Sequence, residues 1–432
     1  MDWKSKLDAY GFRKLSQGEV DLVFSQIKNA VTIGLDRKTE YKTNDGGVLA
    51  IPTKARFIDY SQWQNAKYVN PVIVCNYGGT NWVTGLRQKS KAELLTIGED
   101  VVRHFDMNDR KHSFDEFITF MKIEITRLDR EILDNADTIA MALGFAQKAE
   151  VTEYGLDSRV LPAAMTKHWE INDMYNLPLS CLVGRALLDK LNDKLPKLKN
   201  IYIRNDAEAI GDDVRPLMGN QKILPITLVA GTGLGIVLAH KKDEHNVNLE
   251  IGRAVIKPDT FGVIEHMYNA GVIREPQNII EYHIGGDFIK SKVLFALKNL
   301  AAIKSMSILE NIFDSNHLGD IVSRLAQKEE EFYLPEEDVE ICAHVARAAL
   351  LQAGQLIACA YAAVIEAAGY SRCLDSEEIL IPTDGSILHK AVFVMHEFKA
   401  TLEYFVEHSK MIPLESSGLD GIAKFAIVRR SS

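Results

Sequence analysis

The order of apolar and polar residues changes period several times along the chain and predicts a mixed α/β protein. In NIYIRN, residues 200–205, Ile201 and Ile203 alternate with Tyr202 and Arg204, which is the two-residue period of a strand with one buried face. Apolar residues at helical spacing after Ser113, a candidate N-cap, predict a helix over about 114–132. The same criteria predict helices over about 17–31, 179–191, 287–297, 309–325 and 338–368 and from 418, and strands over 139–145 and 378–382.

Two predicted hairpins share one order of features. PVIVCNYGGTNWVTGLRQ, residues 71–88, and PITLVAGTGLGIVLAH, residues 225–240, each contain a proline, an apolar strand, a Gly-Thr turn and a second apolar strand. A duplicated hairpin suggests two related α/β halves that face each other across a cleft. The alternative is that any two hairpins share these features.

The strand over 200–205 leads directly into Asn205-Asp206 and then into helix-favouring Ala-Glu-Ala. A carboxylate at the carboxyl end of a strand, beside a helix amino terminus, is where α/β proteins place ligand chemistry. Asp206 could accept a proton in such a place. The alternative is that Asn205 or Asp206 only caps the helix.

Composition and charge restrict the class of protein. A chain of 432 residues is long enough for two or three domains of ~150 residues. Its net charge of −9 argues against nucleic acid and anionic membranes as partners, because both select basic surfaces. Five scattered cysteines form no CxxC pair, so we expect no disulfide framework or zinc site, and a cytoplasmic location. The apolar stretch 346–368 contains four polar or charged residues and is interpreted as a buried helix, not as a membrane span.

Several short motifs are candidates for ligand contacts. The turns Gly78-Gly79-Thr80 and Gly231-Thr232-Gly233 would let backbone N–H groups approach a phosphate, although most such turns have no ligand. Neither turn is a Walker A loop, and no GxGxxG dinucleotide motif is followed by a suitable acidic residue. Glu250 and Glu281 could accept hydrogen bonds from a polyol, whereas a single glutamate is usually solvated. Thr166-Lys167 is unremarkable alone, and no histidine pair has metal-ligand spacing, so we expect no protein-held transition metal.

Nine short motifs in the same order resemble those of the hexokinases, which have the actin-like ATPase fold. VIVCNYGGTNWVTGL and LVAGTGLG resemble the two phosphate motifs, and RNDAEA resembles VNDTVG at Asn205 and Asp206. The other similar segments are LGFAQK, MTKHW, NLEIG, QNIIEYHIGG, PTDGSILHK and LESSGLDGIAKFA, and the set spans about 72–426.

The resemblance implies a ribonuclease H-like fold of two domains with a cleft between a small and a large domain. Residues 71–204 would form the small domain and 205–432 the large one, with the helix and arm of 1–70 packed on the large domain. The implied activity is transfer of the γ-phosphate of ATP to the 6-hydroxyl of a hexose, with glucose as the first candidate, in glycolysis.

The implied site residues follow from the matched motifs. Asp206 would be the catalytic base. The hexose would contact Thr166, Lys167, Asn205, Asp206, Glu250 and Glu281. ATP would contact Asn76, Gly78, Gly79, Thr80, Asn81, Gly231, Thr232, Gly233, Asp384, Gly385, Ser386 and Gly418. Mg²⁺ would arrive with ATP and lie near Asn76 and Asp206, without a direct protein ligand.

Three departures from the family pattern keep other functions open. Asn76 replaces the aspartate that opens the first phosphate motif, Ala146-Gln147-Lys148 replaces a serine-phenylalanine-proline, and Gly235 replaces an asparagine. An asparagine keeps an acceptor but loses the charge, so affinity for the metal should fall. The alternatives are a catalytically weak sugar sensor or partner-binding protein, and a kinase of another hexose such as mannose or an amino sugar.

Overall fold

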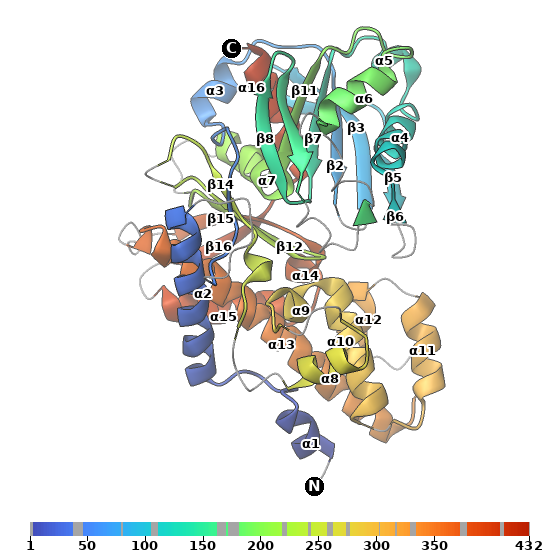
Figure 1. Cartoon of the computed structure of the whole chain (residues 1–432), viewed down its shortest axis with the longest axis vertical. Coiled ribbons are helices and arrows are strands. Elements are labelled where there is room, and N and C mark those ends of the chain that lie inside the picture. The colour runs from blue at the N-terminus through green and yellow to red at the C-terminus, as the bar shows by residue number, and fades with distance from the viewer. Residues whose placement is uncertain are drawn as a thin grey trace.

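Two lobes, each built around one sheet, make up the computed structural model of the chain (Figure 1). The structure describes residues 3–37, 46–78, 81–104, 111–161, 170–171, 181–217, 223–240, 243–256, 262–273, 277–301, 303–315, 318–328, 334–371, 378–406 and 410–431. The lobe at the top of Figure 1, with the eight-stranded sheet, is the small lobe, and the other is the large lobe.

The small-lobe sheet has the order β4-β3-β2-β7-β11-β9-β8, with β5 also paired to β3. The strands β2, β7 and β11 are parallel, and β2 pairs antiparallel with β3. The strands are β2 Val72–Tyr77, β3 Asn81–Ser90, β4 Glu93–Thr96, β5 Val101–His104, β7 Thr138–Leu143, β8 Gln147–Thr152, β9 Gly155–Val160 and β11 Asn200–Asn205. A separate parallel pair joins β6 Lys111–His112 to β10 Glu170–Ile171.

The large-lobe sheet has the order β1-β14-β13-β12-β15-β16. Its first hairpin strand, β12, pairs antiparallel with β13 and parallel with β15, which pairs parallel with β16. The strands are β1 Ala50–Pro52, β12 Ile226–Ala230, β13 Leu234–Leu238, β14 Val247–Leu249, β15 Glu378–Asp384 and β16 Lys410–Glu415.

Both sheets therefore contain the same five-strand arrangement. In each, an antiparallel hairpin supplies the first two strands, a third strand pairs antiparallel with the second (β5 with β3, β14 with β13), and two later strands add in parallel beside the first strand of that hairpin. This repetition is the internal duplication that the two hairpin motifs predicted. The mixed α/β, two-lobed architecture predicted from the sequence is confirmed.

Helices cover the sheets of both lobes. Those of the small lobe are α3 Tyr60–Asn65, α4 Phe114–Ile125, α5 Arg130–Leu133 and α6 Val183–Leu191. Those of the large lobe are α1 Trp3–Ala9, α2 Gln17–Arg37, α8 Val263–Asn269, α9 Glu281–Ile284, α10 Gly286–Asn299, α11 Met306–Ser315, α12 Leu318–Gln327, α13 Glu336–Ala367, α14 Ser386–His389 and α15 Val394–Phe405. The predicted helix over 114–132 ends at Ile125, because Thr126 to Asp129 form a turn, and the predicted helix over 309–325 corresponds to α11 and α12.

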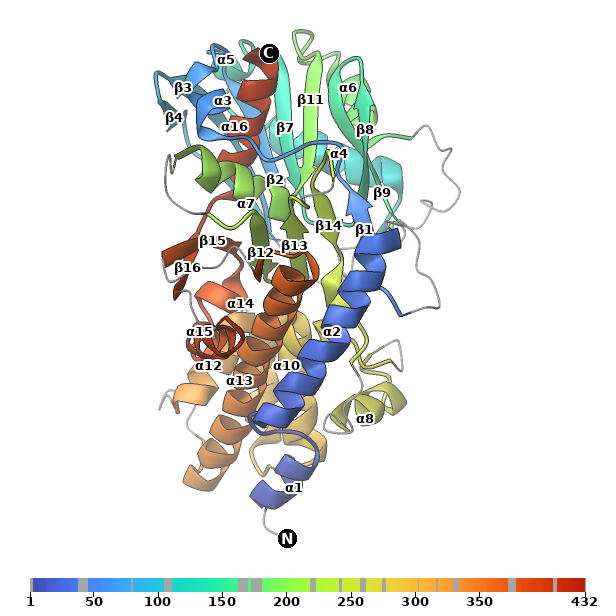
Figure 2. The ribbon, with the colours of Figure 1, turned by 90° about the vertical axis from the view of Figure 1, so that its left-hand side faces the viewer.

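Two further helices, α7 Asp206–Val214 and α16 Gly418–Ser431, cross each other next to the small-lobe sheet (Figure 2). A Cβ atom at Gly421 of α16 would lie 1.7 Å from the carbonyl oxygen of Ala209 in α7, so only glycine permits this approach. The apolar residues of α16, including Leu419 and Ile422, share a core with Val72 and Ala140 of the sheet.

The structure divides the chain less simply than the predicted boundaries at 70 and 204. The helix α16 packs on the small lobe, although residues 205–432 were assigned to the large domain. The N-terminal arm divides as well: α2 packs on α13 and β1 extends the large-lobe sheet, whereas Trp63 of α3 belongs to the small-lobe core.

The helix α13 is long and apolar enough to cross a membrane, but 94% of its most apolar window is buried inside the protein. It is the central helix of the large lobe, as the interrupting polar residues predicted. Four cysteines in the described part of the chain are free thiols: Cys75, Cys181, Cys342 and Cys359.

Candidate functional site

The parallel strands β2, β7 and β11 of the small lobe end in register. Tyr77, Leu143 and Asn205 pair in one row across β2, β7 and β11. Gly78 and Asp206 are the next residues of the outer two strands, so both lie at the same sheet edge. With a spacing of about 4.8 Å per strand, β2 and β11 are roughly 10 Å apart. One edge therefore brings together the first phosphate turn and the predicted base.

Asn205 caps α7, as the alternative interpretation proposed. Its Oδ1 accepts from the backbone N–H of Ala207 at 2.9 Å, and Glu208 accepts from its backbone N–H at 3.3 Å, which completes a capping box. Its Nδ2 lies 3.5 Å from the carbonyl oxygen of Phe145, and the residue is 5% exposed. Asn205 is thus a structural element of the site.

Asp206 is the first residue of α7 and is partly exposed. Its Oδ1 accepts from the N–H of Ala207 at 2.8 Å, and the helix amino terminus favours its negative charge. Its neighbour Ala207 lies against Gly235 of β13, where a Cβ would be 3.8 Å from that of Ala207. The contact places Asp206 where the small lobe meets the hairpin of the large lobe.

The second phosphate turn lies beside the Asp384-Gly385 turn. A Cβ at Gly231 would lie 3.9 Å from the Cα of Gly385, and Val229 of β12 pairs with Asp384 of β15. Gly385 has φ +111°, and a Cβ there would lie 2.1 Å from the carbonyl oxygen of Ala230, so this position requires glycine. Two predicted phosphate segments that lie about 150 residues apart in sequence are therefore neighbours.

Asp384 lies close enough to Asp206 for the two charges to interact. Burial and, to a smaller extent, the negative charge of Asp206 together raise the pKa of Asp384 to about 6, against the lowering effect of a hydrogen bond from Gly385 N–H at 2.6 Å. Two carboxylates, one at the end of a strand in each sheet, thus lie near enough for their charges to interact. The interaction of Asp384 with Asp206 was not predicted from the sequence, because no motif encodes it.

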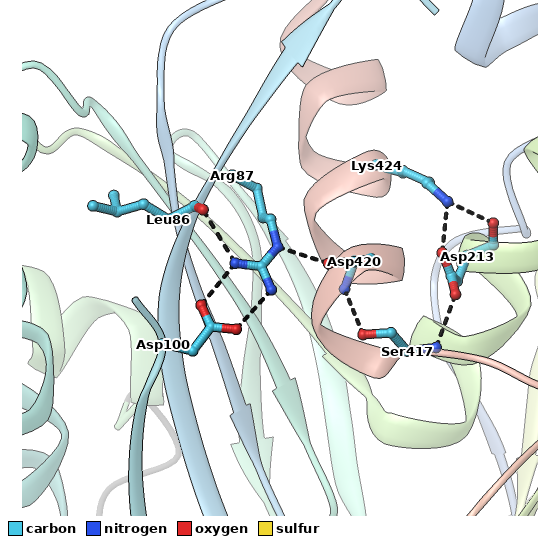
Figure 3. A network of polar contacts seen from close by, with 7 residues as sticks. All are labelled: Leu86, Arg87, Asp100, Asp213, Ser417, Asp420 and Lys424. Atoms are coloured by element: carbon cyan, nitrogen blue, oxygen red, sulfur yellow. Dashed lines mark hydrogen bonds and ion pairs between the residues drawn. The ribbon is translucent and has the colours of Figure 1, made fainter. Parts of the chain in front are cut away.

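The first predicted phosphate motif lies against the last of the nine matched segments, LESSGLDGIAKFA. A Cβ at Gly418 would lie 3.0 Å from Nδ2 of Asn76, so the amino terminus of α16 abuts the position where the resemblance expects an aspartate. Figure 3 shows how this end of α16 is held. Arg87 of β3 binds Asp420 at 2.7 Å and Asp100 at 2.8 and 2.9 Å.

A second set of contacts joins the same end of α16 to α7 (Figure 3). Asp213 of α7 accepts from the N–H of Ser417 at 2.8 Å and binds Lys424 at 2.5 Å. Because Asp206 begins α7, these contacts fix the predicted base and the amino terminus of α16 relative to each other.

The two predicted sugar carboxylates lie close together. Glu250 follows Leu249, which pairs with Ile236 next to Gly235. Glu281 is 5% exposed, and a Cβ at Gly252 would lie 3.6 Å from its carboxyl carbon. Both glutamates therefore approach the hairpin that also contacts Ala207.

The remaining predicted residues fall into three groups. Gly79, Thr80, Thr166 and Lys167 lie outside the described residues. Asn81 begins β3 and accepts from Gly78 N–H at 3.1 Å, and Ser386 begins α14 on the surface. The carbonyl oxygen of Thr232 would lie 2.6 Å from a Cβ at Gly285.

The glycine pair Gly285-Gly286 was not among the predicted site residues. Gly286 donates its N–H to the carbonyl oxygen of Gly231 at 3.0 Å, and it begins α10 directly behind the phosphate turn. The pair ends the segment QNIIEYHIGG. That segment was matched to the hexokinases, but only its glutamate was predicted to contact a ligand, the sugar.

The site fits Mg²⁺ through oxygen ligands, although no cluster of three His, Cys, Asp or Glu side chains occurs among the described residues. Mg²⁺ binds one or two carboxylates together with substrate phosphates. Asp206 and Asp384, whose charges repel each other, are the carboxylates that would be stabilised by a bound cation. Asn76 would add a neutral oxygen.

No protein-family model and no curated protein matches this chain. Solved structures do match it. Hexokinase from Schistosoma mansoni in complex with glucose is 12% identical with a TM-score of 0.71, and 98% of each chain is covered. A ROK family glucokinase from Streptomyces griseus, complexed with glucose and AMPPNP, is 13% identical with a TM-score of 0.50 over 82% of this chain and 99% of that one. A ROK family transcriptional regulator, a homologue of the E. coli MLC protein, is 15% identical with a TM-score of 0.50 over 83% and 78%. The chain therefore has the two-domain, actin-like fold of hexokinases, as the motifs predicted.

Proposed function

We propose that this protein is an ATP-dependent hexose kinase that transfers the γ-phosphate of ATP to the 6-hydroxyl of a hexose, with glucose as the first candidate, in the cytoplasm. The observation that carries the proposal is that the charge of Asp206 acts on Asp384, whose neighbour Gly385 lies against Gly231 in the second phosphate turn. Phosphoryl transfer to a hydroxyl requires a base beside groups that hold the phosphates, and glycine turns are suited to that second task.

Asp206 would accept the proton of the sugar hydroxyl as its oxygen attacks the phosphorus of the γ-phosphate. Phosphoryl transfer depends chiefly on positioning and on neutralising charge. Backbone N–H groups of the turns at Gly78 and Gly231–Gly233 would hold the phosphates, and Glu250 and Glu281 would accept hydrogen bonds from sugar hydroxyls. Mg²⁺ would neutralise phosphate charge beside Asp206 and Asp384. Thr166 and Lys167 remain predicted sugar contacts.

The test is ADP release with MgATP against glucose, mannose, fructose, glucosamine and N-acetylated hexosamines. Asp206→Asn keeps the size and the helix-capping oxygen of the side chain but removes the base, so kcat should fall roughly 10²- to 10⁴-fold. Asp115→Asn is the matched control, since Asp115 is also in the first turn of a helix but lies on the surface far from the site. Unchanged kcat in Asp206→Asn would refute the assignment of the base.

A second candidate is a sugar-binding sensor with weak or no turnover. Asn76 favours it, because this residue faces Gly418 without the charge that the resemblance expects. The shared fold of the ROK family regulator is compatible with it. A sensor would bind one of the hexoses in a calorimetric titration without releasing ADP, and the kinase would do both. A kinase of mannose or an amino sugar would be identified by the same panel.

A further inference from the structure

A row of buried polar side chains crosses the large lobe behind α9, the short helix that begins with Glu281. Nζ of Lys292 in α10 lies 3.1 Å from Nδ1 of His283 in α9 and 2.9 Å from Oε1 of Gln352 in α13. All three residues are 0% exposed. The proposed reaction uses none of them, and burying ionisable side chains costs free energy unless they are hydrogen-bonded.

The chemistry of the partners fixes the direction of each hydrogen bond. Nε2 of His283 lies 2.6 Å from Oδ1 of Asn278, and an amide oxygen only accepts, so Nε2 carries the proton. Burial holds the pKa of His283 well below its usual value and keeps the ring neutral, so Nδ1 accepts from Lys292. Lys292 therefore donates in both directions, to His283 and to Gln352.

The far end of this row is the N-terminal segment. Nε2 of Gln352 donates to the carbonyl oxygen of Gly11 and, at 2.7 Å, to that of Arg13. Phe12 lies between these two residues in sequence, and the centroid of its ring is 5.8 Å from Nζ of Lys292. The segment Gly11–Arg13 is thus tied through Gln352 and Lys292 to α9 and α10.

The near end reaches two parts of the candidate site. His283 is two residues after Glu281 in the single turn of α9, and Asn278 lies three residues before Glu281. Lys292 belongs to α10, whose first residue, Gly286, donates to Gly231 in the phosphate turn. Loss of a hydrogen bond in this row would release the turn that carries Glu281.

We propose that Lys292, His283 and Gln352 are positioning residues that hold Glu281 in place for the sugar, and that the segment Gly11–Arg13 is thereby a determinant of hexose affinity. The proposal rests on the hexose kinase function for its substrate. It assigns a role in the site to residues at the start of the chain.

A pair of glutamines on α13 provides the test. Gln352 and Gln355 are both buried, at 0% and 2% exposure, and both bind the N-terminal segment. Gln355 accepts from Leu15 N–H at 2.9 Å and donates to Leu15 oxygen at 3.1 Å, but the structure records no bond from it to Lys292 among the described residues. Gln352→Leu removes the hydrogen bonds that join Lys292 to the N-terminal segment. Gln355→Leu also removes hydrogen bonds to the N-terminal segment, but none to Lys292 among the described residues.

We expect Gln352→Leu to raise the KM for hexose about 10-fold with kcat changed less than 2-fold, by analogy with the loss of affinity that follows when a residue orienting a metal ligand is removed. Gln355→Leu should leave the KM within 2-fold of the wild type. Equal KM values in the two variants would overturn the proposal, because the effect would then be a general loss of packing.

Two further measurements keep the proposal testable if Gln352→Leu does not fold or the protein is not a kinase. Asn278→Ala removes the acceptor of His283 at the partly exposed end of the row and should also raise the hexose KM, with Asn299→Ala at the end of α10 as control. Hydrogen exchange of residues 279–285 should be faster in Gln352→Leu or Asn278→Ala than in Gln355→Leu. If the wild type binds no hexose and releases no ADP, the kinase function fails. Equal exchange in all variants would overturn the positioning role independently.

Discussion

Replacing Gly421 by alanine should separate the two helices on which the candidate site depends. A Cβ at this position would lie 1.7 Å from the carbonyl oxygen of Ala209 and 2.9 Å from the backbone nitrogen of Asp213. Both atoms belong to the backbone of α7, so no side-chain rotation can make room. Contacts of this kind are normally at least 3.4 Å, so α7 and α16 must move apart by roughly 1.7 Å.

The size of the effect follows from two opposed terms. Overpacking of a core costs about 1–3 kcal/mol, and the upper end applies here because two helix backbones must shift. Alanine gains up to about 1 kcal/mol over glycine through helix propensity. The net loss of unfolding free energy is therefore about 2 kcal/mol. Activity should fall further, because Asp206 begins α7 and Gly418 begins α16.

Urea unfolding followed by circular dichroism measures the loss of unfolding free energy in Gly421→Ala. ADP release is measured on the same samples. The matched control is Gly18→Ala in α2, where a Cβ would have no atom within 4 Å. That variant should be as stable as the wild type or more stable by up to about 1 kcal/mol. If Gly421→Ala unfolds at the same urea concentration as Gly18→Ala, the close crossing of α7 and α16 is wrong.

Three other changes test separate parts of the site. Burial and the charge of Asp206 raise the pKa of Asp384 from 3.8 to about 6 in the folded protein. The folded state therefore binds this proton more tightly than the unfolded state does, and the resulting contribution to stability is lost as the pH rises from 4 to above 6. Asp384→Asn should therefore be more stable than the wild type at pH 8, by at most about 3 kcal/mol, and equal to it at pH 4, in urea unfolding at both values. Asn76→Asp should lower the Mg²⁺ concentration required for half-maximal ADP release by several-fold, and no shift would mean that this position does not face the metal. Arg87→Met should lower the unfolding free energy by about 1–3 kcal/mol, because it leaves Asp100 and Asp420 without the cation that they share. A loss no larger than that of the surface variant Arg185→Met would contradict this expectation.

The fold could be predicted from the sequence where local pattern and local structure agree. The hairpins, the strand over 200–205 and the long apolar helix all have strong periodicity, and the structure has them within a few residues. The β8–β9 hairpin was missed, because QKAEVT and GLDSRV have weak alternation and few apolar residues. The three-residue strands β1 and β14 are too short for any periodic signal.

The candidate site was predicted in part for the same reason. Short motifs identified Asp206, Gly231 and Gly385 as candidate residues, and the structure places Gly231 against Gly385 and lets the charge of Asp206 act on Asp384. The motifs did not indicate that Asp384 interacts with Asp206, or that Gly418 abuts Asn76, because these contacts join segments more than 170 residues apart. Pairings of that kind depend on how two sheets and two crossing helices are placed, which no local pattern specifies.

The position of α16 on the small-lobe sheet has a consequence for synthesis. The ribosome makes ~210 residues between β11 and α16, which takes roughly 10–40 s at 5–20 residues per second. During that time the sheet face formed by Val72, Val74, Ala140 and Ala142 has emerged without the helix that covers it. The small-lobe sheet, which is fully translated at residue 205, therefore waits for the last helix of the chain, and nascent chains that end before residue 418 should expose an apolar surface that chaperones recognise.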